Sequence, residues 1–230
     1  MKGLKILFIV IFLLIITLVI VLANYGVIEY IQIRKLNNDS RHLGILPNQY
    51  DINKNNTFSK TSIEKFDNII FRLPWNEYKI RNQNAENAKN SIAYDVGEDY
   101  IFSIIKTSQN RKILENSYIK DFKDMSIIEL KRSIISITPN ESKIFMPKKE
   151  AINLKTALLC KKNLLLSIGN CEEVYFIETE NLACIQYKKS NSSSILEFQF
   201  KDKDEELYMI LSNIEQNDLE YILCSITLGT

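Results

Sequence analysis

The sequence predicts an α+β protein, in which an antiparallel sheet is covered by helices on one face and preceded by an N-terminal transmembrane helix. Three observations predict this class. An apolar run opens the chain, segments with apolar residues at every second position predict strands, and segments with apolar residues every three or four positions predict helices. These segments follow one another as a strand pair, a helix pair, antiparallel strands and a last helix, an order typical of an α+β layer.

Residues 6–23 form the opening apolar run, in which Thr17 is the only polar residue. At about 1.5 Å rise per residue the run would span about 27 Å, close to the hydrocarbon thickness of a bilayer. A cleavable signal usually has an apolar run of only about 7–15 residues. The length therefore favours a retained anchor. The small-residue pattern of a cleavage site is nevertheless met at the end of the run, so cleavage after Ala23 stays open.

A juxtamembrane helix is expected to follow, so residues 1–36 are predicted as the anchor with this helix. Tyr25 and Tyr30 lie where aromatic residues flank a bilayer. Lys2 and Lys5 precede the run, while the basic residues behind it lie further away, so the charge rule barely decides the orientation. The distant basic residues are Arg34, Lys35 and Arg41. A short N-terminus stays inside by default, which predicts a cell-membrane protein with an extracytoplasmic C-terminal domain.

Residues 37–60 are rich in Asn, Asp and Ser without sustained periodicity, which predicts a spacer of partly ordered loop. The α+β domain is predicted over residues 61–230. In its clearest strand, "LEFQFK", the apolar side chains point one way and the polar ones the other. Alternation of this kind predicts strands in four segments: 69–73, 99–107, 172–189 with a turn at "ETEN", and 194–212 with a turn at "KDKDEE".

Three segments with helical spacing fill the gaps between the strands. Ser126 and Glu129 form a capping box at the start of the first helix. Pro147 suits the first turn of the second helix, and Asp218 is expected to cap the third. The apolar stripes of the three helices are, in order, Ile127, Leu130, Ile134 and Ile137; Ala151, Leu154, Leu158 and Leu165; and Leu219, Ile222, Leu223 and Ile226.

Residues 66–228 combine a "FRLPW" strand end, a central helical insertion, a long antiparallel meander and a closing amphipathic helix. This order of elements resembles the PsbP/Mog1-like domains. The resemblance implies a small binding or assembly-factor domain, often without enzymatic activity. It carries no functional residue over to this chain.

No catalytic, cofactor or metal site is predicted. His42, the single histidine, lies in the spacer, which argues against a Ser–His–Asp or Cys–His arrangement inside the domain. Only Gly97 and Gly169 fall inside the folded region before the last residues, so a phosphate-cradling glycine loop is not expected. Carboxylates gather in "YDVGEDY", where a hairpin turn explains them better than a calcium site. Three Ser-x-x-Lys matches are close to what chance gives in this composition.

The cysteines show no Cys-x-x-Cys spacing, so a zinc site is not expected. They are Cys160, Cys171, Cys184 and Cys224. An extracytoplasmic location would permit disulfides, and Cys160 and Cys224 lie opposite the apolar stripes of their helices. Reduced core thiols are the alternative, and the disulfide state stays open. Trp75, the single tryptophan, follows a strand end, where closing the edge of a core is favoured over anchoring a binding surface.

Charge excludes some partners. Without Lys2 and Lys5 the chain holds 27 basic and 28 acidic residues, which gives no basic excess for nucleic acid. Heavy use of Ile, Asn and Lys is typical of an AT-rich bacterial genome. We expect a membrane-anchored domain that binds an envelope protein or a cell-wall component.

An enzyme of the cell envelope that uses dispersed Asp, Glu or Ser residues is the alternative function. Such an enzyme would show a pocket with convergent carboxylates of shifted pKa, whereas a binding module would show an exposed apolar patch or groove. A third interpretation keeps the domain in the cytoplasm as a tethered regulatory piece. Reduced cysteines would favour that interpretation.

Overall fold

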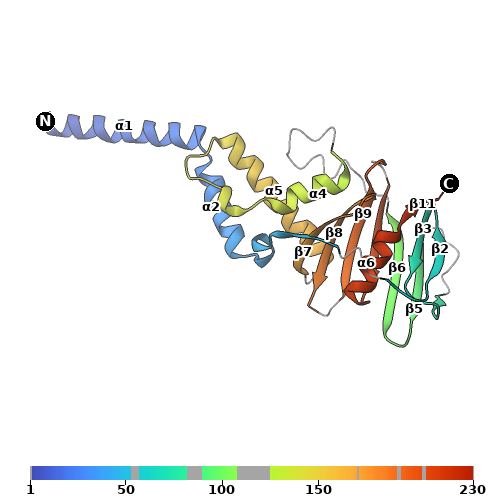
Figure 1. Cartoon of the computed structure of the whole chain (residues 1–230). Helices are drawn as coiled ribbons and strands as arrows, with labels where there is room; N and C mark the ends of the chain where they lie inside the picture. Colours follow the sequence, from blue (N-terminus) through green and yellow to red (C-terminus); the bar gives the residue numbers. More distant parts are fainter. Residues whose placement is uncertain are drawn as a thin grey trace.

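The computed structural model describes residues 2–52, 57–81, 90–107, 125–169, 171–190, 193–203 and 206–229. A long N-terminal helix extends away from a layer of helices, and the sheets lie beyond that layer (Figure 1). The helices are α1 (Lys2–Asn24), α2 (Val27–Asn38), α4 (Ile127–Ser136), α5 (Lys148–Ile168) and α6 (Gln216–Ser225), with 3₁₀ turns η1 (Arg41–Gly44) and η3 (Pro139–Glu141).

Eight strands form the main sheet in the order β1-β7-β8-β9-β10-β6-β5-β4. The described strand pairs are antiparallel, except that β1 runs parallel to β7. The strands are β1 (Pro47–Tyr50), β4 (Lys79–Ile80), β5 (Ser91–Val96), β6 (Tyr100–Thr107), β7 (Cys171–Glu178), β8 (Leu182–Lys189), β9 (Ser194–Phe200) and β10 (Leu207–Ser212). A small sheet has the order β11-β3-β2, with β2 (Ser62–Phe66), β3 (Ile69–Leu73) and β11 (Thr227–Leu228).

The main sheet buries side chains on both of its faces. On one face α4 and α5 pack over Val174, Ile185 and Tyr187. On the other face α6 and the small sheet pack over a larger cluster that includes Phe102 and Phe198. The α+β class and the helix-covered sheet are confirmed; the sheet is mixed because β1 runs parallel to β7, and helices cover both of its faces where one was predicted. The first two predicted strands, β3 and β6, lie in different sheets.

Residues 37–60 hold more structure than the expected loop. Leu43 of η1 is buried with Ile33 and Leu158, and β1 adds an edge strand to the main sheet. The segment "PNQY" shows no apolar alternation because it forms an edge strand, in which no side chain is buried. It is held in the sheet by pairing with β7. A proline is tolerated at the first position of such a strand.

The helix ends follow two of the three predicted signals. The capping box of α4 is confirmed: the Glu129 amide donates to Ser126 Oγ at 3.2 Å, and the Ser126 amide donates to Glu129 Oε2 at 2.7 Å. Pro147 lies immediately before α5. The cap predicted for α6 is wrong, since Asp218 lies inside the first turn and accepts a hydrogen bond from Trp75 instead.

Candidate functional site

A cavity of about 280 Å³ lies beside α4, at the side where this helix covers β7, β8 and β9. Its lining includes Glu129, Arg132, Glu178, Gln199, Phe200 and Lys201. Arg132 lies on α4 between the buried residues Lys131 and Ile134, Glu178 is the last residue of β7, and Lys201 directly follows β9. Two cations and one carboxylate, distant in sequence, therefore meet in this cavity.

Arg132 is the central residue of this cavity. Its Nη1 donates to Glu178 Oε1, and its Nη2 donates to the backbone carbonyls of Ile177 and Cys184, each at 2.8 Å. The guanidinium carbon lies 5.1 Å from the ring centre of Phe176, a cation–π contact. Nε is buried, and it has no hydrogen-bond partner among the described residues. The side chain thus holds α4 against β7 and β8 while one donor is left unused.

Glu178 accepts from two cations. Lys201 Nζ lies 3.0 Å from its Oε2 and also donates to the carbonyl of Thr179 at 2.7 Å. Burial would raise the pKa of Glu178, but the hydrogen bonds from Arg132 and Lys201 outweigh burial and lower it. The carboxylate therefore stays ionised at neutral pH, which suits a charge that orients its neighbours and does not suit a proton donor.

A buried ion pair joins α4 to β9 beside the cavity. Lys131 Nζ lies 2.6 Å from Glu197 Oε1, and the Tyr187 hydroxyl donates to Glu197 Oε2 at 3.1 Å. Burial lowers the pKa of Lys131, although Glu197 opposes the shift, and burial raises the pKa of Tyr187. Glu197 belongs to the polar side of the "LEFQFK" alternation, and α4 covers that side. These residues hold α4 in place and are closed to a ligand.

A second polar cluster lies at the turn between β2 and β3. Lys106 Nζ contacts Asp67 Oδ2 at 2.6 Å and Glu206 Oε1 at 3.1 Å, and the Tyr208 hydroxyl donates to both carboxylates. Asn68 donates to Glu206. Asp67 has a φ of +52°, as a two-residue hairpin requires. The hydrogen bond that Lys106 donates lowers the pKa of Asp67 despite its partial burial. The charged groups of this cluster bind one another, and they join the turn of the small sheet to β6 and β10 of the main sheet. The cluster is therefore a structural link between the two sheets.

The structure places the remaining sequence-selected residues in structural positions. Val96 pairs with Tyr100, so Gly97, with a φ of +69°, lies in a hairpin turn as predicted. Trp75 packs against the core and donates to Asp218 at 3.1 Å, which confirms its place at the edge of the core. Burial raises the pKa of Asp218, although the indole opposes this shift. Within the described ranges no group of three metal-ligating side chains occurs.

The cysteines and the histidine are scattered. Cys171 and Cys184 are buried on opposite faces of the sheet, and burial raises the pKa of Cys171 to about 11. Cys160 is half-buried and Cys224 is exposed; in the part of the chain that the structure describes, none of the four cysteines forms a disulfide. His42 is buried in η1, and its Nδ1 has no hydrogen-bond partner among the described residues.

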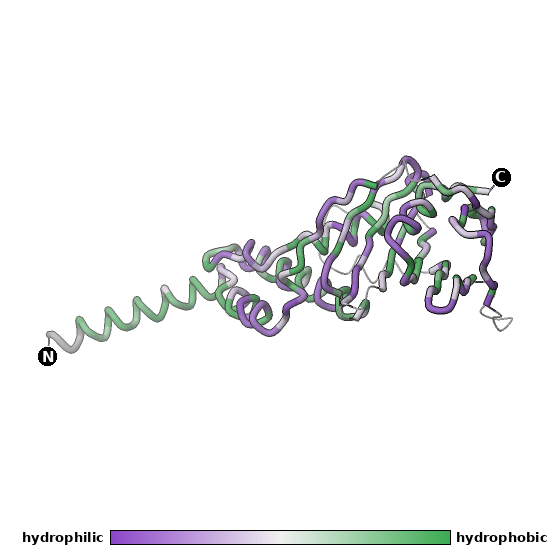
Figure 2. Tube along the Cα trace, turned by 60° about the horizontal axis from the view of Figure 1, so that its bottom comes forward, coloured by the Kyte–Doolittle hydropathy of each residue, from purple (hydrophilic) through white to green (hydrophobic). Residues whose placement is uncertain are grey.

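The junction between α1 and the domain is the second candidate feature. Within the described helices, Ile6–Asn24 is long and apolar enough to cross a bilayer, and the rest of the chain buries none of it. Figure 2 shows this helix as a continuous apolar rod. Directly after this helix, Tyr25 forms a backbone bridge with Pro147, and the Gly26 amide donates to the Met146 carbonyl at 2.9 Å. By length and composition, α1 is a signal sequence or a membrane anchor.

Sequence reasoning missed the charged groups of the cavity, because each lies on a different element and none belongs to a linear motif. The capping box was the signal that placed α4, and with it Arg132, but nothing local indicated Glu178 or Lys201 as its neighbours. Comparison with models of known families and with curated proteins finds no match. The resemblance to PsbP/Mog1-like domains stays a prediction.

Proposed function

We propose that this chain is a single-pass membrane protein whose α+β domain is held outside the cell membrane and acts by binding an envelope protein or a cell-wall component. The observation that carries the proposal is α1, an apolar helix with no buried face that is joined directly to the domain. An apolar helix of this length is stable in lipid and costly in water.

Retention of α1 is supported by how it ends. Val21 and Ala23 belong to the helix, and the Tyr25 amide donates to the Val21 carbonyl at 2.9 Å. The next residue, Gly26, already packs on Ala151 of α5. A chain cut after Ala23 would begin at Asn24, only two residues before the packed Gly26. A packed joint of this kind suits an anchor, since it ties the end of the helix to the domain.

The pKa shifts of the described carboxylates favour binding over catalysis. Among the described carboxylates with a shifted pKa, Glu178, Asp67 and Glu206 are lowered by paired cations despite burial, and Asp218 alone is raised. A pair of carboxylates with separated pKa values, which acid–base chemistry needs, is not seen in these ranges.

We place the partner at the cavity beside Arg132. The cavity is concave, its wall is fixed by the buried Lys131–Glu197 pair, and Glu129 and Lys201 remain accessible at its rim. Arg132 and Lys201 both line the cavity, so a partner that brings an acceptor oxygen suits it.

Two observations favour the opposite orientation, with a tethered regulatory domain in the cytoplasm. The four thiols are not linked as disulfides within the described chain. Basic residues also gather beside the end of α1, where Lys143, Lys148 and Lys149 are exposed. The two candidates place the domain on opposite sides of the membrane, so one experiment separates them.

The test combines intact mass with thiol labelling. The mass of the native chain from washed membranes distinguishes an uncut chain from one cleaved after Ala23. A membrane-impermeant maleimide applied to spheroplasts should modify the exposed Cys224, and Cys224→Ser should remove most of the label. Label that enters only after lysis would place the domain in the cytoplasm. A shortened chain released from the membrane would overturn the anchor.

A further inference from the structure

The loop before α5 carries apolar and basic residues side by side. In the segment "KIFMPKK", residues 143–149, Ile144 is 47% and Phe145 63% exposed. Lys143, Lys148 and Lys149 flank them and are also exposed. Adjacent large apolar side chains on a surface usually mark a contact with another phase or another molecule.

The position of this loop beside α1 indicates what its apolar side chains contact. Tyr25, the first residue beyond α1, forms a backbone bridge with Pro147, and its ring lies 5.8 Å from that of Phe145 in an edge-to-face arrangement. Figure 1 shows the loop before α5 beside the end of α1. If α1 crosses a bilayer, its polar end at Asn24 lies at the membrane surface, and Phe145 lies at the same depth.

The residue types agree with this position. Aromatic rings concentrate at the boundary between the acyl chains and the headgroups. Lysine side chains can bury their stems there and place the ammonium group on lipid phosphates. One apolar pair between basic residues is the pattern of a peripheral membrane contact.

We propose that residues 143–149 form a second membrane contact, in which Ile144 and Phe145 enter the interfacial layer of the bilayer that α1 crosses. Lys143, Lys148 and Lys149 contact anionic headgroups. This inference rests on the proposal that α1 is retained as an anchor. The loop and α1 together attach the domain at two points, which fixes its tilt and directs the far end of the sheets away from the membrane.

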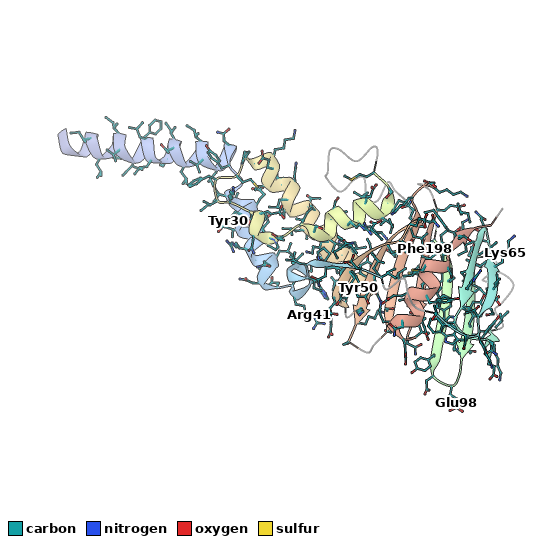
Figure 3. All side chains as sticks on the ribbon, in the orientation of Figure 1. Tyr30, Arg41, Tyr50, Lys65, Glu98 and Phe198 are labelled. Atoms are coloured by element: carbon teal, nitrogen blue, oxygen red, sulfur yellow. The ribbon has the colours of Figure 1, made fainter. Side chains whose placement is uncertain are left out.

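The test uses the full-length chain reconstituted into vesicles of anionic and zwitterionic lipid that carry brominated acyl chains, which quench nearby indoles. Phe145→Trp reports on the loop. Tyr100→Trp is the matched control, because Tyr100 is 46% exposed on the hairpin beside Glu98, which lies at the far end from α1 (Figure 3). Trp75 is present in both variants and provides the same baseline.

We expect the added emission of Phe145→Trp to be quenched at least about twofold more than that of Tyr100→Trp. The excess should decrease when anionic lipid is omitted, or when Lys143, Lys148 and Lys149 are all replaced by Gln. Far-ultraviolet circular dichroism of each variant verifies the fold.

Equal quenching of the two variants in vesicles that retain the protein would overturn the loop contact while leaving the anchor intact. An indole at position 145 that is shielded from both bromine and aqueous iodide would indicate a protein neighbour, which would also overturn the lipid contact. Protein that does not float with the vesicles would overturn the anchor, and this inference with it.

Discussion

Lys131 Nζ lies 2.6 Å from Glu197 Oε1, in an ion pair whose two side chains are almost completely buried between α4 and β9. Burying the pair costs free energy, because both charges lose their hydration. Removing one partner leaves the other charge buried and uncompensated. The pair therefore specifies where α4 sits on the sheet, and it holds the wall of the cavity that Arg132 lines.

We expect Glu197→Ala to lower the free energy of unfolding by about 3–5 kcal/mol, because Lys131 would remain buried without its partner. Lys131→Met combined with Glu197→Leu should recover most of that loss, since apolar replacements remove both charges. Guanidinium denaturation of the full chain in detergent measures each change. As a control, Arg81→Ala breaks the half-exposed pair with Asp95 and should cost no more than about 1 kcal/mol. Similar costs at both sites would contradict the prediction.

The stability of the domain should depend on pH through Lys161. This residue of α5 is buried and donates to the Ile137 carbonyl at 2.9 Å. Burial lowers its pKa from 10.5 to about 8, although Glu141 opposes the shift. Between these two values the unfolded chain binds a proton that the folded chain does not. Stability therefore rises with pH in this window, by about 1.4 kcal/mol per pH unit.

Lys161→Met should remove this dependence. The free energy of unfolding of the native chain, minus that of the variant, should increase as the pH is raised from about 8 to 9.5. Comparing the two proteins cancels the titration of all groups that they share. A difference that stays constant over this range would show that Lys161 keeps its ordinary pKa in the folded state.

Gly26 should be required at the junction between α1 and the domain. A Cβ atom at this position would lie 2.1 Å from the Cβ atom of Ala151, so one of the two backbones would have to move. We expect Gly26→Ala to destabilise the chain by about 1–3 kcal/mol, the usual cost of overpacking. Thermal unfolding in detergent measures the loss.

Ala151→Gly supplies the control for this clash. Alone it should cost about 1 kcal/mol, because glycine is a poor helix residue. Combined with Gly26→Ala it should restore part of the lost stability, since the two Cβ atoms no longer compete. Additive losses in the double variant would mean that the two residues do not meet in the folded chain.

The proposed partner site can be tested with a photo-crosslinking residue. Placed at Lys201, on the rim of the cavity, it should give a discrete adduct in intact cells. Placed at Lys65, an exposed position at the far end from α1 (Figure 3), it should give far less of the same adduct. Loss of the half-exposed Lys201–Glu178 contact should cost less than about 1 kcal/mol, so the probe leaves the fold intact. Equal yields of that adduct at both positions would argue against the cavity.

Features that depend on neighbours in sequence were predictable. The capping box of Ser126 and Glu129 needs only residues three apart, and the alternation in β9 repeats every two residues. The apolar length of α1 is likewise a local property. Each of these signals is decided by the helix or strand that carries it, so the α+β class and the main helices could be derived without knowledge of the packing.

Features that depend on contacts between distant segments were not predictable. β1 is a strand because β7 lies beside it, and Asp218 lies in the first turn of α6, where it accepts a hydrogen bond from Trp75 of a distant segment. Alternation indicates that the side chains of β9 face two ways, but only packing shows that both faces are covered.

The sequence by itself therefore determined an apolar N-terminal helix, an α+β domain and the absence of familiar linear motifs. Only the tertiary structure decided which charges meet. Lys131 and Glu197 are an ordinary lysine and glutamate in the sequence, and they become a buried pair because α4 crosses β9 at that point. The free energy of a charge depends on its surroundings once water is removed, and those surroundings come from segments far apart in the chain.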